Sequence, residues 1–331
     1  MTQPLFHRMA AAIGAALLPL AFTAPAIGDD DERMALDPVD VSAGAPAPGK
    51  PLYQAPAVDV VTGAEKARRE GASLGATLEH LPGVTNIGTG NQTGKPVIRG
   101  LSGNRVSILS NGIGVDHQQF GVRHTPNIDS FLSERIEVVR GASSILYGSG
   151  ALGGAVDVQS QPLTFSPDGS SSAGGEALLG FHSNNGQWDT GVKGTARGGR
   201  WSLSGGLVHR DGDEIETPNE PTFGESGNRG DPKFTGELPF TDFEQLNGQL
   251  GVGYRADFGE IRLRYTGWRN EQNFLLPNGK GIGQNLENDE VQLSGLFPAG
   301  GAWTLEPSLT WQNNLRESNA AGTPRSDLFD G

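Results

Sequence analysis

The pattern of apolar and polar residues becomes strictly alternating from about Gly174 onward. In one such run Trp201, Leu203 and Leu207 fall on one side, and Ser202 and Ser204 on the other. A repeat of two residues places these sets on opposite faces of a β-strand. The pattern predicts about seven antiparallel strands, near 175–184, 187–197, 200–210, 243–256, 260–270, 287–297 and 302–313.

The length and the ends of these runs are typical of strands that span a membrane. Trp303 and Trp311 are eight residues apart, which is ~20 Å along the membrane normal at ~3.3 Å per residue and ~40° tilt, close to an apolar band of ~25 Å. Short connections alternate with long polar ones at 211–242 and 271–286, as expected for periplasmic turns and extracellular loops. We therefore predict the N-terminal part of a transmembrane β-barrel over residues 174–331.

A different pattern precedes the long strands, and it predicts a mixed α+β domain over residues 53–160. Leu74, Leu78 and Leu81 have helical spacing, and Pro82-Gly83 ends that helix. Short strands are expected over 96–99, 106–110, 135–139 and 155–159. A helical turn is expected over 128–131.

The N-terminus indicates export. Met9 to Phe22 is an apolar run, and Ala24-Pro25-Ala26 follows it as a small-residue cleavage pattern, so residues 1–26 are predicted to be a secretory signal peptide. Residues 27–52 hold a short β-prone island and then a linker rich in Ala, Pro and Gly. Taken alone, the island fits either a strand that adds to a partner's sheet or a disordered terminus.

Composition excludes several classes of protein. The 331 residues include 50 Gly and no Cys, and the formal net charge is -13. The lack of Cys excludes disulfides and thiolate metal sites, and the acidic balance argues against nucleic acid as a partner. Neither a serine nucleophile elbow nor a zinc-protease helix occurs in the sequence. We expect no cofactor.

Four motifs, in order along the chain, resemble those of the TonB-dependent outer-membrane receptors. The island Leu36, Asp37, Pro38, Val39, Asp40, Val41 and Ser42 resembles the TonB box. Residues 78–84 resemble the first plug helix and its exit, and residues 97–101 resemble the first Arg-Gly motif of the plug. Residues 134–158 resemble the long plug signature.

This resemblance implies a mixed plug domain inside a membrane β-barrel of a Gram-negative outer membrane, in contact with its lipid. It implies that TonB, with its inner-membrane energising complex, captures the box by strand addition and remodels the plug. No bond is made or broken, so the protein is not expected to be an enzyme. Arg99 and Arg140, each followed by Gly, are expected to pair with barrel carboxylates and to dock the plug reversibly.

The expected ligand loop runs from Val115 to Asp129. It carries Asp116, His117, Phe120, Arg123 and His124, with two of the six His of the chain. His117 and His124 suit a metal ion, Phe120 and Arg123 suit an anionic chelate, and a merely solvated loop is the third alternative. The family resemblance favours import of a ferric siderophore or related chelate, with a divalent metal such as zinc, haem or cobalamin as alternatives. The plug and the box argue against a passive porin or an adhesin.

The expected number of strands is small for this family. Plugged transporters use about 22 strands, and bacterial barrels of one chain have an even number. About seven strands do not close around a plug, so we expect the sequence to be a truncated reading of a longer gene.

Overall fold

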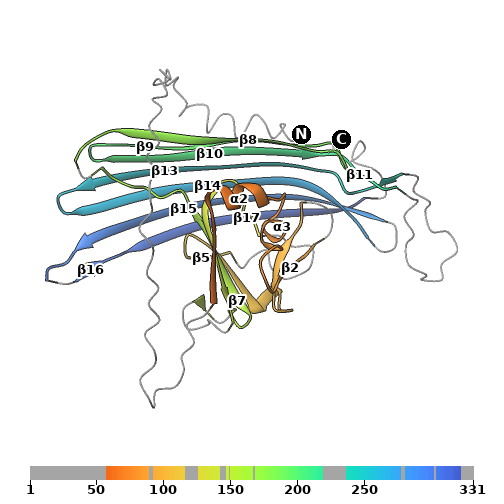
Figure 1. Cartoon of the computed structure of the whole chain (residues 1–331), viewed down its shortest axis with the longest axis horizontal. Helices are drawn as coiled ribbons and strands as arrows, with labels where there is room; N and C mark the ends of the chain where they lie inside the picture. Colours follow the sequence, from red (N-terminus) through yellow and green to blue (C-terminus); the bar gives the residue numbers. More distant parts are fainter. Residues whose placement is uncertain are drawn as a thin grey trace, which may run out of the picture. The chain divides into compact units, whose positions relative to one another are not determined.

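The computed structural model describes residues 57–88, 92–115, 126–141, 147, 148, 150–166, 168–218, 236–276, 280–301 and 303–321. An α+β domain occupies residues 57–166, and a sheet of long strands follows it (Figure 1). Among the described residues, no helix is both long enough and apolar enough to cross a membrane.

The α+β domain is built on a five-stranded sheet in the order β1-β6-β7-β4-β5. Strands β4 and β7 are parallel, and the other neighbours are antiparallel. A separate hairpin pairs β2 with β3. The bounds are β1 Ala57–Thr62, β2 Val84–Ile87, β3 Lys95–Ile98, β4 Val106–Ser110, β5 Ile113–Gly114, β6 Ser133–Arg140 and β7 Gly154–Ser160. The predicted strands are therefore present, and β1, β2 and β5 were missed.

Two helices, α2 (Gly63–Arg69) and α3 (Leu74–Leu78), and a 3-10 turn, η1 (Gly103–Arg105), complete the domain. The Ser73 hydroxyl caps α3 by accepting a hydrogen bond from the backbone N–H of Ala76 at 3.2 Å. Leu78 of α3 is fully buried in the apolar core between the helices and the sheet. The helix predicted from the spacing of Leu74, Leu78 and Leu81 is thus confirmed, and it ends at Leu78.

The helical turn predicted over 128–131 is wrong. The Asp129 carboxylate accepts a hydrogen bond from the backbone N–H of Phe131 at 2.9 Å. This local bond competes with helix formation, and the segment runs as an irregular turn into β6.

The long-strand sheet contains all seven predicted strands, joined antiparallel to their neighbours in the chain. Their bounds are β8 Ser172–His182, β9 Gln187–Gly198, β10 Trp201–Gly212, β13 Phe243–Ala256, β14 Gly259–Leu275, β15 Gly281–Pro298 and β17 Ser308–Ala321. The short strands are β11 Ile215–Glu216, β12 Glu237–Leu238 and β16 Thr304–Leu305.

One predicted loop is mostly strand. Residues 271–286 were expected to form a long loop, but β14 and β15 stay paired out to Leu275 and Gly281. Polar residues support this extension, since the Asn273 side-chain amide donates to the Asp242 carboxylate at 3.0 and 3.1 Å. Polarity along a strand is therefore a poor guide to where its pairing ends.

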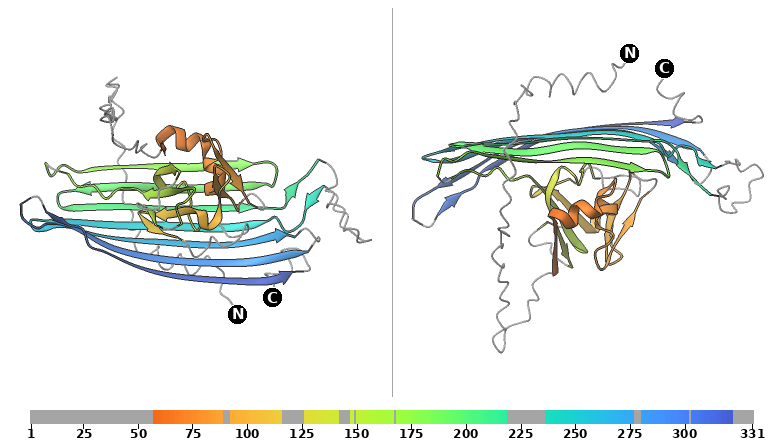
Figure 2. Two further views of the ribbon diagram at one scale, coloured as in Figure 1. Left: turned by 90° about the horizontal axis from the view of Figure 1, so that it is seen from below. Right: turned by 45° about the horizontal axis from the view of Figure 1, so that its top comes forward.

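The two faces of the long-strand sheet differ in chemistry. Aromatic pairs lie on the outward face, including Phe181 with Trp188 at 4.9 Å and Trp201 with Tyr254 at 4.8 Å between ring centroids. Figure 2 shows the α+β domain, in orange to yellow-green, on the opposite side of the long strands. An apolar outer face and a covered polar inner face are what a plugged barrel requires.

The outward aromatics also define a tilt. Following the cross-strand pairs from Trp188 through five strand-to-strand steps leads to Glu317 on β17, a lateral distance of ~24 Å at ~4.8 Å per step. Trp311 lies six residues from Glu317, or ~20 Å along the strand. With both indoles at the same membrane interface, the strands tilt by ~40° from the membrane normal, which is within the range of outer-membrane β-barrels.

Candidate functional site between the domain and the sheet

Arg210 of β10 is the largest fully buried side chain of the described residues, and it points from the sheet toward the α+β domain. Its Nε and Nη2 atoms donate to both carboxylate oxygens of Asp129, at 2.9 and 3.2 Å. Nη1 donates to Asp189 at 2.7 Å, and Nη2 also donates to Glu70 at 3.1 Å. We call these four residues the Arg210 cluster.

The cluster joins three distant segments of the chain. Glu70 follows α2, and Asp129 lies in the turn before β6, so both belong to the α+β domain. Asp189 lies on β9 beside Arg210 and is its cross-strand register partner. One guanidinium therefore connects the sheet to two separate parts of the domain.

Burial and neighbouring charges shift the pKa values of the cluster residues that belong to the α+β domain. Burial opposes ionisation of Asp129, but the Arg210 guanidinium outweighs it and holds the pKa of Asp129 below its ordinary value. Burial raises the pKa of Glu70, although Lys66 and Arg210 favour its charged form. Burial likewise lowers the pKa of Lys66, whose Nζ lies 3.7 Å from Glu70 and donates to the Ser130 carbonyl at 2.7 Å.

Further side chains of the sheet bind the backbone that follows Asp129. The Gln249 amide donates to the Leu132 carbonyl at 2.7 Å, and Lys193 Nζ donates to the Ser133 carbonyl at 3.0 Å. Lys193 also lies over the Phe131 ring, at 5.2 Å from its centroid, and pairs with Glu176 at 3.2 Å. Segment 129–133 is thus held along its length.

The chemistry of the cluster is non-covalent. It contains a cation shared among carboxylates, with side chains no more than 7% exposed. Such buried charges are costly to separate one at a time, yet no covalent bond must break. The arrangement is suited to firm but reversible docking.

The structure places the two predicted docking arginines within the domain. Arg140 pairs with Asp59 of β1 and donates to the Pro82 carbonyl. Arg99 is exposed and has a positive φ of 49°. Docking of Arg99 or Arg140 onto barrel carboxylates stays a prediction.

The other predicted site residues lie outside the described residues. This applies to the TonB box, Leu36–Ser42, and to the ligand loop with Asp116, His117, Phe120, Arg123 and His124. Within the part of the chain that the structure describes, no group of three or more His, Asp or Glu side chains is placed to hold a metal ion.

Sequence reasoning missed the Arg210 cluster. The alternation of β10 assigns Ser202 and Ser204 to the polar face, and Arg210 falls on that same face by parity. The side of the sheet on which Arg210 lies was therefore predictable from the sequence. Its three carboxylate partners were not, because two of them are 81 and 140 residues away.

A polar-faced sheet with an apolar, aromatic exterior and a domain docked on its inner face defines the plug and barrel strands of an outer-membrane receptor. Residues 51–155 match the family model described as TonB-dependent Receptor Plug Domain. Residues 51–155 are thus a plug domain of the TonB-dependent receptor type, and the long strands that follow have the fold of the barrel strands in that family. Members of this family are transporters of Gram-negative outer membranes rather than enzymes.

Relatives by sequence match only part of the chain. The Hemin receptor of Yersinia pestis is 36% identical over 108 residues, which are 31% of this chain and 16% of that receptor. The Vitamin B12 transporter BtuB of Vibrio vulnificus is 29% identical over 164 residues, 48% of this chain and 26% of the transporter. The matches thus span about a sixth to a quarter of these relatives' lengths.

Solved structures share the fold. The Copper transporter OprC superposes with a TM-score of 0.61 at 21% identity, covering 78% of this chain and 37% of that one. The FrpB iron transporter from Neisseria meningitidis gives a TM-score of 0.61 at 17% identity, covering 78% of this chain and 41% of that one. The long strands therefore correspond to barrel strands, and the α+β domain to the plug.

Proposed function

We propose that the receptor to which this chain belongs imports a scarce nutrient actively across the outer membrane, with a ferric siderophore or related metal chelate as cargo. In this proposal residues 1–26 are a signal peptide, residues 27–52 hold the TonB box and linker, residues 53–160 are the plug and residues 174–331 are barrel strands. TonB and its inner-membrane energising complex supply the work.

The observation that carries the proposal is the Arg210 cluster. It docks a plug domain on the polar inner face of membrane strands through contacts that separate without chemistry. A permanently open porin has no use for such a contact. An energised receptor needs one, because its plug must block the barrel at rest and must rearrange during transport.

Haem is the second candidate cargo. The curated relatives include the Hemin receptor of Yersinia pestis and the Heme/hemopexin utilization protein C of Haemophilus influenzae, which is 41% identical over 91 residues. Cobalamin and divalent metals such as zinc remain further alternatives.

Coupling is tested by Val41→Pro in the full-length receptor. Proline removes a backbone N–H and fixes φ, so strand addition to TonB should fail. We expect uptake to be lost while surface binding of the cargo is unchanged. Ala47→Pro, in a linker that already holds Pro46 and Pro48, is the matched control and should keep uptake. Uptake at the wild-type rate by Val41→Pro would falsify the box assignment.

The cargo is tested by supplying ferric siderophore, haemin or zinc as the sole source of the metal to cells that express the receptor. If His117→Ala with His124→Ala lowers zinc affinity about 100-fold while ferric-siderophore uptake stays intact, zinc import replaces chelate import as the better assignment. Growth on haemin alone would favour the second candidate.

A further inference from the structure

The inner face of the barrel strands becomes basic at the end where the strands join by short turns. Arg197 of β9 is in register with Ser202, Gly253 and Arg262 across three strands. Arg264 lies on the same face of β14 and donates to the Gln161 carbonyl at 2.9 Å. The short turns mark the periplasmic end in barrels of this class, so these arginines line the exit side.

Carboxylates are scarce among these arginines. Arg255 of β13 and Arg262 share a single carboxylate, Glu260. Among the described residues, neither Arg197 nor Arg264 has a carboxylate within salt-bridge distance, and Arg197 bonds the Ser172 hydroxyl through its Nε at 2.7 Å. The chain as a whole has 38 acidic and 25 basic residues. Four arginines with one carboxylate are therefore a local reversal of the overall charge.

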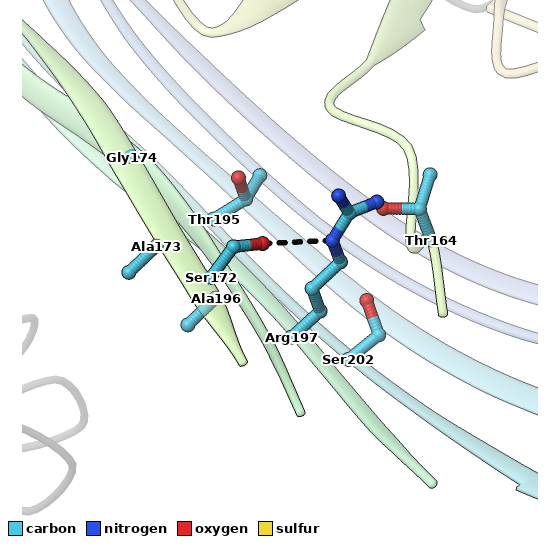
Figure 3. Close-up of a pocket in the computed structure, with 8 residues that line it drawn as sticks. All are labelled: Thr164, Ser172, Ala173, Gly174, Thr195, Ala196, Arg197 and Ser202. Atoms are coloured by element: carbon cyan, nitrogen blue, oxygen red, sulfur yellow. Dashed lines mark hydrogen bonds between the residues drawn. The ribbon is translucent and has the colours of Figure 1, made fainter. Parts of the chain in front are cut away.

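A cavity of about 250 Å³ adjoins Arg197. Hydroxyl groups dominate its wall, and Figure 3 shows them around the Arg197 side chain, with its guanidinium on the side of Thr164. The lining residues are Thr164, Ser172, Ala173, Gly174, Thr195, Ala196, Arg197 and Ser202. The volume accommodates several waters or an oxyanion with its hydration.

A second cavity of about 260 Å³ shares Thr164, Gly174 and Thr195 with the first. Its wall also includes Glu134 and Glu176. These two carboxylates face Lys193, whose Nζ lies 4.0 and 3.2 Å from them. Lys193 thus partly neutralises their charge, whereas the other polar side chains in the wall of the Arg197 cavity are all hydroxyl groups.

We propose that the Arg197 cavity is an oxyanion-binding subsite on the exit side of the barrel. A guanidinium binds carboxylate or phosphate oxygens through paired N–H groups, and serine and threonine hydroxyls donate additional hydrogen bonds. The subsite rests on the proposed transport function and narrows it. The cargo carries anionic oxygen groups, since the Arg197 guanidinium, which has no carboxylate partner among the described residues, repels a bare divalent cation.

The same chemistry serves two sources of oxyanion, which are the anionic groups of a chelate in transit and free phosphate of the periplasm. The binding test uses inorganic phosphate with the purified full-length receptor in titration calorimetry. Arg197→Gln removes the charge from the cavity wall. Arg200→Gln is the matched control, because Arg200 sits in the adjoining turn, pairs with Asp257 at 2.8 Å and does not line the cavity.

We expect saturable phosphate binding by the wild type and by Arg200→Gln, and at least about tenfold weaker binding by Arg197→Gln. Arg197→Lys should restore part of the affinity. Lack of saturable binding by the wild type, or equal losses in both glutamine variants, overturns the subsite. Thermal unfolding of each variant checks that the barrel is intact.

The transport test compares ferric citrate with a ferric trihydroxamate that has no net charge. Arg197→Gln should slow ferric citrate uptake about tenfold without changing surface binding, and should leave trihydroxamate uptake unchanged. If phosphate binding depends on Arg197 but ferric citrate uptake does not, the anion is free phosphate and the cargo role falls. If no variant imports any chelate, the proposed function fails, while the phosphate titration still decides the subsite.

Discussion

Replacing Arg210 with Met should release the plug from the barrel far more easily. The substitution keeps much of the side-chain volume but leaves the carboxylates of Asp129, Asp189 and Glu70, which are 2%, 6% and 7% exposed, without their shared cation. Removing one partner of a buried ion pair costs ~3–5 kcal/mol, because the remaining charge is left without a partner. We expect the docked state to lose about that much stability.

The assay is the conductance of the full-length receptor in a planar bilayer as urea is raised, since in the proposed function the plug blocks the pore until it is released. A loss of about 4 kcal/mol and a urea dependence of about 2 kcal/mol per M lower the midpoint by about 2 M. Arg269→Met is the control, because Arg269 binds Asp289 at 2.9 Å on the outward face of β14 and β15. Similar midpoints for Arg210→Met and Arg269→Met would refute the assigned role of the cluster.

Two further predictions use the same conductance assay. Asp129 has a folded pKa below its ordinary 3.8, so it stabilises docking fully above pH 3.8 and loses this contribution on further acidification. The urea concentration at the midpoint should therefore decrease in the wild type when the pH is lowered below about 3.8, and should decrease much less in Asp129→Asn. Glu70, whose folded pKa lies above its ordinary 4.5, acts in the opposite direction: its contribution is fully present below that pH and is lost as the pH rises, so Glu70→Gln should flatten the pH dependence above about pH 4.5. Gly154→Ala should destabilise the plug by more than ~2 kcal/mol, because Gly154 has a φ of +148° and an added Cβ would lie 2.2 Å from the Val139 carbonyl oxygen. Gly112→Ala, with a φ of +80° and open space around the added atom, incurs only the conformational cost of ~1–2 kcal/mol, and an equal loss in both variants contradicts the steric argument.

Most of the sheet was predictable from the sequence because its signal is local. Alternation with a period of two located all seven long strands. Asn111 and Gly112, both with positive φ, form the turn between β4 and β5, as expected for an Asn-Gly pair. The failures had two different origins. The Asp129 carboxylate accepts a local hydrogen bond from the backbone N–H of Phe131 in place of a helical turn, whereas Asn273 near the end of β14 binds Asp242, 31 residues away in the chain.

The candidate site was only partly predictable, because an ion cluster depends on contacts between remote segments. The sequence led us to expect docking charges on Arg99 and Arg140, since both precede glycine in family motifs. The described contacts show a cation on the barrel strand β10 and carboxylates on the plug. Parity along β10 assigns Arg210 to the inner face, but no periodicity specifies that Glu70 and Asp129 meet there.

The composition of the Arg210 cluster bears on how a plug can leave in steps. Glu70 precedes Asp129 by 59 residues in the chain, so in the proposed energised transport a force applied from the N-terminal side reaches β1, α2 and Glu70 before it reaches Asp129. When Glu70 withdraws, Arg210 still holds Asp129 through two hydrogen bonds and Asp189 through one. The guanidinium is never left without a carboxylate, and this avoids the largest cost of separating buried charges. Because Asp189 belongs to the barrel itself, the same argument covers the final step, in which Asp129 departs and the Arg210–Asp189 pair remains on the barrel wall.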